Sequence, residues 1–270
     1  MKTRDRKRLV YKLQGHQNGG TGIALVHSLA MDRAFWQPVA DKLAADAPVL
    51  TFDCRGHGAS DKANGPYTVE LFADDLADLL DQVGWKSALV AGASMGGCIA
   101  LAFAAAYPDR TAGLGLVDTT TWYGPQAPEQ WAERATRAAK DGMSALVEFQ
   151  TTRWFSDKFR ANRPDVVRQC VDVFLRNDVK AYVETCHMLG AADLRAKLPR
   201  MTMPTAVVVG DEDYATPVAM AEAMHLAIKG STLTVLAGAR HLTPLEAPDR
   251  IAGELTALAG RVKELRMEQA

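Results

Sequence analysis

A Gly-x-Ser-x-Gly pattern at Gly92, Ser94 and Gly96 could supply a nucleophile. The apolar run 88–93 before it predicts a short strand, and the small residues at 98–106 after it predict a helix. A sharp strand-to-helix turn exposes the serine, while the glycines leave room for the neighbouring backbone. We therefore expect Ser94 to act as a nucleophile, with the helix N-terminus favouring developing negative charge.

A serine nucleophile needs a general base, and that base needs a group that orients it. His241 follows the last apolar strand pattern, and functional groups of a parallel sheet gather at such strand ends. Asp213 follows the preceding strand pattern, and Pro217 is expected to start a helix behind it. We expect His241 to be the base and Asp213 the acid. Asp118, at the end of another strand pattern, remains open as the alternative acid.

Acyl-transfer chemistry also needs two backbone N–H groups that stabilise an oxyanion. We expect one from Met95, directly after the nucleophile, and the other from Leu29, in the loop after a strand pattern. His27 and His57 are expected to be structural loop histidines. Three histidines remain, and none has an acidic or cysteine partner at metal-ligand spacing: His16, His187 and His225. We therefore expect no metal, and the proposed chemistry needs no cofactor.

Strand and helix patterns alternate over the first 120 residues, which predicts a parallel sheet covered on both faces. Residues 8–14 are expected to form an edge strand, followed by a hairpin turn at 15–20. From about residue 129 to 195 the pattern is helical throughout, without a buried-strand run. We therefore predict an α/β core domain of residues 1–121 and 199–270, with a helical cap inserted at 122–198.

Composition excludes several classes of protein. The 270 residues carry a formal net charge of −1, so no overall field attracts nucleic acid or an anionic membrane. Neither a signal peptide nor a run of 18 apolar residues is found, and the basic run 2–8 is expected to be a solvated terminus.

The four cysteines lack C-x-x-C spacing, so we expect reduced thiols and a cytoplasmic protein. Oligomeric state stays open.

Several motifs together resemble the α/β-hydrolase fold from about residue 9 to 259. The resemblance implies a mostly parallel eight-stranded sheet flanked by helices, with an inserted helical cap. It also implies that Ser94, Asp213 and His241 form the catalytic triad. The motifs are His27-Ser28-Leu29, Asp53-x-Arg55-Gly56-His57-Gly58-x-Ser60, the turn at 92–96, Gly210-x-x-Asp213 with Pro217, and His241 followed by Glu246-x-Pro248.

Within that superfamily the chain is similar to 3-oxoadipate enol-lactone hydrolases. This resemblance implies opening of a small anionic enol-lactone through an acyl-enzyme. Two stretches depart from the family pattern: 27–31, and 243–245 after the histidine. The matching stretches are Ser28-Leu29 with Asp32 and Trp36, 55–61, Gly65-Pro66-Tyr67-Thr68, Arg153-Trp154-Phe155 and Ala192-Asp193-Leu194-Arg195.

The insertion is expected to determine specificity, because the sheet alone cannot enclose a small ester or lactone. Trp122, Trp154 and Phe155 are candidate walls, and Arg153 or Arg134 is a candidate partner for a substrate carboxylate. A carboxylesterase, a C–C bond hydrolase or a cofactor-free haloperoxidase remains an alternative on the same scaffold. A ligand-binding receptor with little turnover is the alternative from another class.

Overall fold

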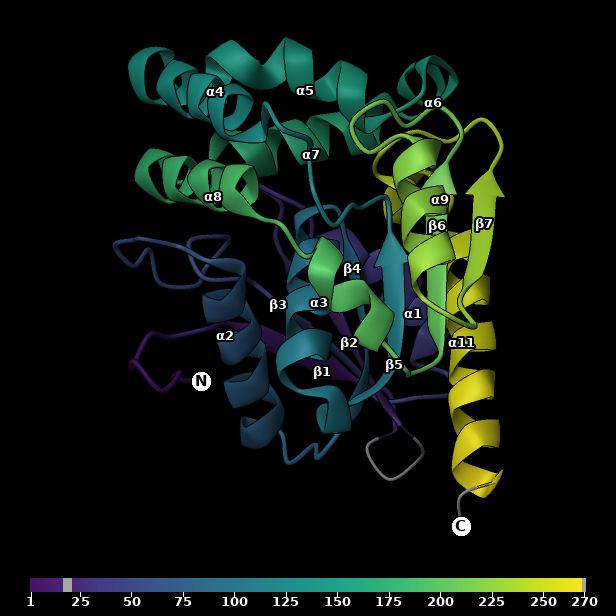
Figure 1. The fold of residues 1–270 in the computed structure, drawn as a ribbon. Helices are drawn as coiled ribbons and strands as arrows, with labels where there is room; N and C mark the ends of the chain where they lie inside the picture. Colours follow the sequence, from purple (N-terminus) through teal and green to yellow (C-terminus); the bar gives the residue numbers. More distant parts are fainter. Residues whose placement is uncertain (17–20, 269–270) are drawn as a thin grey trace.

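The computed structural model describes residues 1–16 and 21–268, which build a seven-stranded sheet with helices on both faces (Figure 1). The strand order is β1-β3-β2-β4-β5-β6-β7, and β1 alone runs antiparallel to its neighbour. The strands are β1 (Tyr11–Gln14), β2 (Gly22–Val26), β3 (Val49–Phe52), β4 (Ala88–Ala93), β5 (Thr111–Val117), β6 (Thr205–Gly210) and β7 (Thr232–Leu236).

The central strands are covered on both faces, as their continuous apolar runs predicted. Every residue of β2, β3, β4 and β6 is buried, whereas β7 at the sheet edge is mostly exposed or half-buried. This burial confirms the predicted fold class, a mostly parallel sheet between two helical layers.

The N-terminal segment differs from the prediction. Eight strands were expected, and the described residues form seven. Arg8 makes only an isolated bridge to Lys2, because the chain folds back between them, and β1 begins at Tyr11. The predicted hairpin is wrong, since β3 lies between β1 and β2 in the sheet. Part of its expected turn, residues 17–20, lies outside the described residues.

Helices cover the sheet in pairs. α1 packs against α11 on one face, and α2 packs against α3 on the other (Figure 1). α9 packs against β6 and β7. The helices of these two layers, including the short α10, are α1 (Gln37–Leu43), α2 (Val69–Gln82), α3 (Met95–Ala106), α9 (Val218–Ala227), α10 (Thr243–Glu246) and α11 (Pro248–Glu268).

Five further α-helices lie between β5 and β6 in the chain, beyond the carboxyl ends of those strands (Figure 1). α4 packs along α8, and the short α6 was not predicted. The division of the chain into a core domain and a cap at 122–198 stays a prediction. The five helices are α4 (Ala127–Asp141), α5 (Val147–Trp154), α6 (Asp157–Asn162), α7 (Pro164–Leu175) and α8 (Val179–Ala191).

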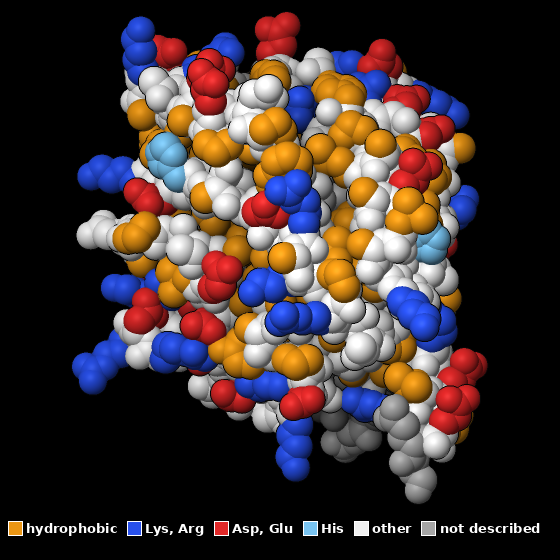
Figure 2. Space-filling view, in the orientation of Figure 1, with side chains coloured by type: hydrophobic (Ala, Val, Ile, Leu, Met, Phe, Trp, Pro, Cys, Tyr) orange, Lys and Arg blue, Asp and Glu red, His pale blue; other side chains and the backbone are white. Residues whose placement is uncertain are grey.

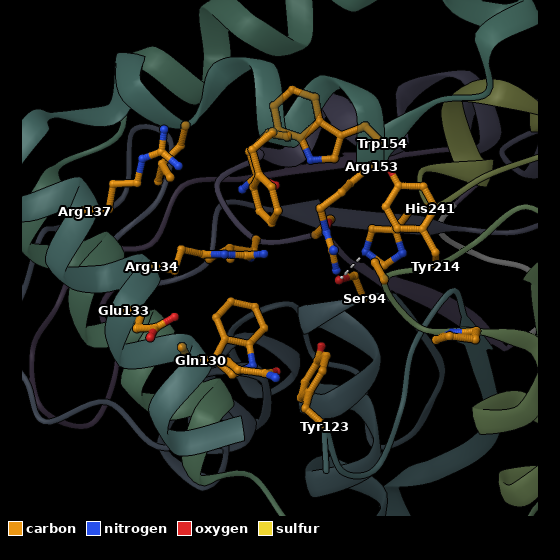
Figure 3. Close-up of a pocket in the computed structure, with 18 of the residues that line it drawn as sticks. Ser94, Tyr123, Gln130, Glu133, Arg134, Arg137, Arg153, Trp154, Tyr214 and His241 are labelled. Atoms are coloured by element: carbon orange, nitrogen blue, oxygen red, sulfur yellow. Dashed lines mark hydrogen bonds between the residues drawn. The ribbon is translucent and has the colours of Figure 1, made fainter. Parts of the chain in front are cut away.

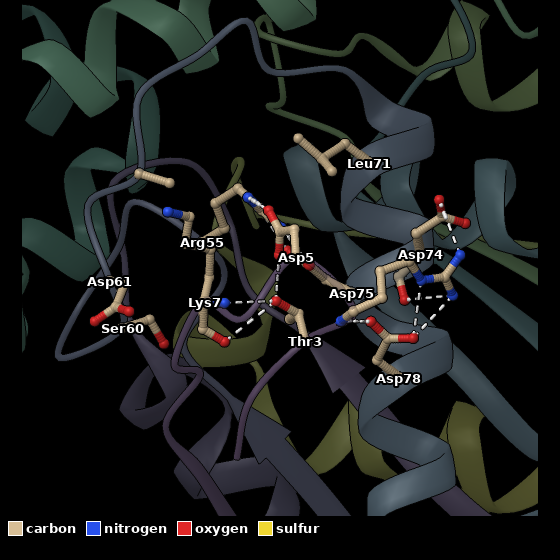
Figure 4. Close-up of polar contacts among 12 residues, drawn as sticks. Thr3, Asp5, Lys7, Arg55, Ser60, Asp61, Leu71, Asp74, Asp75 and Asp78 are labelled. Carbon is tan, nitrogen blue, oxygen red and sulfur yellow. Dashed lines mark hydrogen bonds and ion pairs between the residues drawn. The ribbon is translucent and has the colours of Figure 1, made fainter.

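The basic N-terminal run is not simply solvated. Arg4 forms an ion pair with Asp78 of α2 at 2.9 Å, and Asp5 pairs at 2.7 Å with Arg55, in the loop after β3 (Figure 4). Arg55 is buried and also pairs with Asp75 of α2 at 2.6 Å. These contacts fasten the N-terminal segment and the loop after β3 to the same helix.

Positive and negative side chains are intermixed over the face of the molecule seen in Figure 2, in keeping with the small net charge. None of the helices in the described part of the chain is long and apolar enough to cross a membrane. All four cysteines are buried and free: Cys54, Cys98, Cys170 and Cys186.

Candidate active site

Ser94 occupies a strained turn between β4 and α3. Its φ of +53° and ψ of −117° lie in a region that residues with a side chain rarely adopt. Gly96 must lack a side chain, because a Cβ there would lie 2.8 Å from the carbonyl oxygen of His27. Gly92 is equally constrained, since its Cβ would lie 2.6 Å from the backbone nitrogen of Gly97. The glycine spacing therefore permits the turn that lifts Ser94 out of the sheet.

Three side chains from distant parts of the chain form a continuous hydrogen-bonded series. His241 Nε2 lies 2.9 Å from Ser94 Oγ, and His241 Nδ1 lies 2.7 Å from Asp213 Oδ2. Figure 3 shows the first of these two contacts. All three residues are at least 93% buried, with relative exposures of 6%, 7% and 3% for Ser94, His241 and Asp213. The arrangement can pass the serine proton to an imidazole that a carboxylate orients.

The Asp213 carboxylate is held by its own loop. It accepts hydrogen bonds from the backbone N–H of Ala215 and of Thr216, at 2.7 and 2.9 Å, and from the Thr216 hydroxyl at 2.7 Å. Burial acts to raise the pKa of Asp213, but His241 and these donors outweigh burial and lower that pKa. The carboxylate is thus kept charged beside the imidazole.

Asp118, the alternative acid, does not contact His241. Its carboxylate accepts hydrogen bonds from the N–H of Gly210 at 3.2 Å and from the N–H and hydroxyl of Thr243 at 3.0 and 2.6 Å. Burial, and then the charge of Asp213, raise the pKa of Asp118 well above its ordinary value. Asp118 therefore links three strand-end loops, and Asp213 is the carboxylate hydrogen-bonded to His241.

Leu29 and Met95 flank Ser94 from the loop after β2 and from the first turn of α3. The Met31 N–H bonds the Ser28 carbonyl at 3.1 Å, which places Leu29 at the corner of a tight turn. Met95 is the first residue of α3, where a backbone N–H has no partner within the helix. Neither N–H donates a hydrogen bond to any residue in 1–16 or 21–268, so both remain available to a ligand.

The two histidines near the site are engaged elsewhere. His27 accepts a hydrogen bond from the Cys54 N–H at 3.0 Å, and His57 Nδ1 lies 2.9 Å from the Arg55 carbonyl oxygen. Burial lowers the pKa of both, and that of His57 falls to about 3. Both are therefore neutral structural residues, as expected. The described residues contain no group of three His, Cys, Asp or Glu side chains that could hold a metal ion.

A cavity of about 610 Å³ opens above Ser94, under the helices of the insertion (Figure 3). Arg153 and Arg134 point into it, with the ring of Phe149 5.0 and 4.9 Å from their guanidinium carbons. No ion pair joins either arginine to an acid among the described residues, although Glu133 also lines the cavity. Burial, and then the charge of Arg134, lower the pKa of Arg153. The cavity thus offers the guanidinium groups of Arg153 and Arg134 to an anion.

The end of α5 is fastened to the loop that carries His241. The Trp154 carbonyl accepts hydrogen bonds from the N–H groups of His241 and Leu242, at 3.1 and 3.0 Å. Arg240 donates to the carbonyls of Thr152 and Phe155, at 2.8 and 3.0 Å. The loop that carries His241 therefore also fixes the cavity wall.

Of the five candidate substrate contacts, the structure brings three to the cavity, Arg134 among them. Arg153 and Trp154 line it, whereas Trp122 and Phe155 do not. Trp122 packs instead beneath Arg195, whose guanidinium carbon lies 3.6 Å from the ring centroid. Phe155 is fully buried, with its ring 4.9 Å from that of Phe159. These two assignments are corrected, because Trp122 is half-buried against Arg195 and Phe155 is buried against Phe159, both outside the cavity lining.

Several lining residues were not predicted from the sequence. Tyr123 stands in a stretch that resembles a linker, and Tyr214 directly follows Asp213. The position of Tyr214 at a strand end was an available signal, since such loops gather around the site. The unpredicted members of the lining include Tyr123, Trp131, Phe149, Tyr214 and Met220.

Comparison with known proteins identifies the family. A family model described as the alpha/beta hydrolase fold matches residues 23–248. Two 3-oxoadipate enol-lactonases of Acinetobacter baylyi are similar: enol-lactonase 1 is 29% identical over 97% of this chain and 96% of its own, and enol-lactonase 2 is 30% identical over 82% of each.

Solved structures agree over nearly the whole chain. The enol-lactonase from Burkholderia xenovorans LB400 superposes with a TM-score of 0.91 at 32% identity, covering 96% of this chain and 98% of that one. A thermophilic esterase from Thermogutta terrifontis, solved with malate bound, gives 0.90 at 30% identity over 96% of each chain. The chain therefore belongs to the α/β-hydrolase fold family and is similar to its 3-oxoadipate enol-lactonases and related esterases.

Proposed function

We propose that this protein is a serine hydrolase that cleaves a small ester or lactone through an acyl-enzyme. The observation that carries the proposal is the hydrogen-bonded series Ser94–His241–Asp213 at the floor of a cavity. The enol-lactonases and the esterase to which the chain is similar support the same class of reaction.

In the first step Ser94 Oγ attacks the carbonyl carbon while its proton moves to His241 Nε2. Asp213 holds the other imidazole nitrogen and stabilises the positive charge that forms. The N–H groups of Leu29 and Met95 are proposed to receive the oxyanion, and one such donor contributes about 3 kcal/mol of transition-state stabilisation. The bond to the leaving oxygen then breaks, and that oxygen takes the proton from His241.

In the second step water attacks the acyl-enzyme. His241 accepts a proton from that water and returns it to Ser94 Oγ as the free acid leaves. These steps use only side chains and backbone groups of this chain, so we propose a reaction that needs no cofactor.

The substrate proposed is an anionic enol-lactone of the 3-oxoadipate type. Arg153, with Arg134 beside it, is proposed to bind the substrate carboxylate, because a guanidinium matches the planar geometry of a carboxylate. Trp154 forms an apolar wall next to Arg153. The malate held by the Thermogutta esterase is itself a dicarboxylate, which supports an anionic ligand. The helices at 122–198 are proposed to act as the cap that encloses it.

A substrate panel separates this proposal from its alternatives. We expect purified protein to hydrolyse 3-oxoadipate enol-lactone with a higher kcat/KM than p-nitrophenyl butyrate, and Ser94→Ala to abolish both activities. A preference for the neutral ester would favour a carboxylesterase. Carbon–carbon cleavage of a diketone or halogenation with peroxide would favour the other hydrolase alternatives. Ligand binding without turnover of any compound would favour a receptor.

Two further assignments are proposals of the same kind. We propose a cytoplasmic location, which the four free, buried thiols favour. A small-molecule ester or lactone is the proposed partner, with no role for nucleic acid or a membrane. Fractionation of the native host tests the location directly.

A further inference from the structure

One polar side chain in the cavity has no part in the mechanism above. Tyr123 lines the cavity, and its hydroxyl points toward Ser94 from a different side than His241 (Figure 3). The same hydroxyl lies 4.0 Å from Cys98 Sγ, and Tyr123 and Ser94 both line the cavity. The reacting oxygen of Ser94 thus has a phenol group close beside it.

The orientation of Tyr123 is fixed by its neighbours. Its ring meets that of Trp131 edge to face, with centroids 5.2 Å apart and an interplanar angle of 78°. The preceding turn is closed by Thr120, whose hydroxyl bonds both the N–H and the carbonyl of Trp122, at 3.2 and 2.9 Å. The Tyr123 hydroxyl is therefore held in place before a substrate binds.

Strand order determines which side of the substrate Tyr123 faces. β4, which carries Ser94, lies between β2 and β5. Leu29 follows β2, whereas Tyr123, like Asp213 and His241, follows a strand on the other side of β4. Tyr123 is thus across Ser94 from the Leu29 N–H that is proposed to bind the oxyanion. We infer that a leaving oxygen directed away from the Leu29 N–H comes near both His241 and the Tyr123 hydroxyl, which line the same cavity.

The phenol keeps its proton at working pH. Burial, and then the neighbouring Cys98, raise the pKa of Tyr123 well above its ordinary value. Cys98 is no acceptor for that proton, because burial raises its own pKa as well. Tyr123 therefore has a permanent O–H that can donate a hydrogen bond but does not act as a base.

We propose that Tyr123 is a further catalytic residue, whose hydroxyl donates a hydrogen bond to the leaving oxygen as its bond to the acyl carbon breaks. This inference rests on the proposed serine hydrolase function. The Ser94 Oγ–carbon bond forms, the carbon–oxygen bond of the leaving group breaks, and its electron pair stays on the leaving oxygen. The proton on that oxygen comes from His241, while Tyr123 retains its own and stabilises the developing charge.

The test compares leaving groups in the variant Tyr123→Phe. We expect kcat/KM for an ethyl ester, whose alkoxide is strongly basic, to fall roughly 10- to 100-fold, because a hydrogen bond to a developing charge is lost. For the p-nitrophenyl ester of the same acid, which leaves as a stabilised phenolate, we expect a change of less than about 3-fold. Tyr182→Phe is the matched control, since it removes another buried phenol outside the cavity lining.

The outcomes are distinct. An equal fall with both esters, or no fall with either, overturns the role of Tyr123, because a merely structural change cannot depend on the leaving group. The same selective loss in Tyr182→Phe also overturns it. A wild-type protein that hydrolyses neither these esters nor 3-oxoadipate enol-lactone, and is then indistinguishable from Ser94→Ala, overturns the proposed function instead, together with this inference.

Discussion

The buried carboxylate of Asp118 accepts two hydrogen bonds from Thr243, one from its backbone N–H at 3.0 Å and one from its hydroxyl at 2.6 Å. Thr243 begins α10 two residues after His241. Through Gly210, Asp118 also reaches the strand end that leads to Asp213. A single side chain at the end of β5 therefore holds the loops of both partners of Ser94.

Replacing Asp118 by Ala is expected to lower the free energy of unfolding by about 3 kcal/mol, because three buried donors lose their acceptor. We also expect kcat to fall at least about 10-fold. Without Asp118 the loop that carries His241 loses its hydrogen bonds to that carboxylate, so the distance and angle between His241 and Ser94 are less well fixed. Urea unfolding and ester hydrolysis measure the two effects. Asp109→Ala is the control, and equal behaviour of the two variants would refute the linking role.

Stability is expected to fall in mild acid because His57 is buried and neutral. Its pKa is lowered to about 3 in the folded protein, against 6.5 for the free side chain. The unfolded chain therefore binds a proton that the folded chain does not, and the contribution of His57 is complete above pH 6.5. Between pH 6.5 and about 3 that contribution decreases by about 1.4 kcal/mol per pH unit.

The variant His57→Gln, which cannot titrate, tests this pH dependence. Urea unfolding at pH 6, 5.5 and 5 is expected to give a slope shallower by about 1.4 kcal/mol per pH unit than in the wild type. His187→Gln, at an exposed position, is the control and should leave the slope unchanged. Parallel slopes in wild type and His57→Gln would contradict the assignment of His57 as a neutral buried residue.

Arg153→Met is expected to act on anionic substrates alone. Loss of a hydrogen-bonded ion pair with the substrate should lower kcat/KM for the p-nitrophenyl half-ester of glutaric acid about 10- to 100-fold. The neutral p-nitrophenyl butyrate has no carboxylate and should change less than about 3-fold. Arg163→Met, at an exposed position on the insertion, is the control. Equal losses with both substrates would exclude a carboxylate-binding role for Arg153.

Two glycines should respond in opposite ways to an added methyl group. Gly96→Ala places a Cβ against the backbone of Val26 and His27, so we expect at least about 3 kcal/mol of destabilisation and loss of activity. Gly253→Ala adds a methyl in open space on α11 and should stabilise by about 0.5–1 kcal/mol. Thermal unfolding measures both, and a Gly96→Ala protein of normal stability and activity would contradict the close packing at the turn.

The sequence predicted the framework because its signals are local. Apolar runs such as Gly22–Val26 and the spacing of small residues around Ser94 depend only on neighbours in the chain. Chain order and strand-end position also predicted the contact of His241 with Ser94. The choice between Asp213 and Asp118 stayed open, since both follow buried strands and only the fold decides which carboxylate meets the imidazole.

The cavity wall could not be predicted in the same way. Trp154 and Phe155 are adjacent at the end of α5, yet one lines the cavity and the other is buried against Phe159. The direction of a side chain at a helix end depends on how the whole insertion packs. That packing produces no periodic pattern of apolar residues from which the direction could be predicted. For the same reason the sequence did not predict that Tyr123 lines the cavity. It wrongly predicted that its neighbour Trp122, which packs against Arg195, does so.

The most direct test of the central claim is to trap the covalent intermediate. Protein mixed with excess p-nitrophenyl butyrate is quenched in acid within the first turnovers, digested and analysed by mass spectrometry. We predict a butyryl group on the peptide that contains Ser94, in the wild type and not in Ser94→Ala. An unmodified Ser94 peptide, together with hydrolysis that persists in Ser94→Ala, would contradict acyl-enzyme catalysis by this residue.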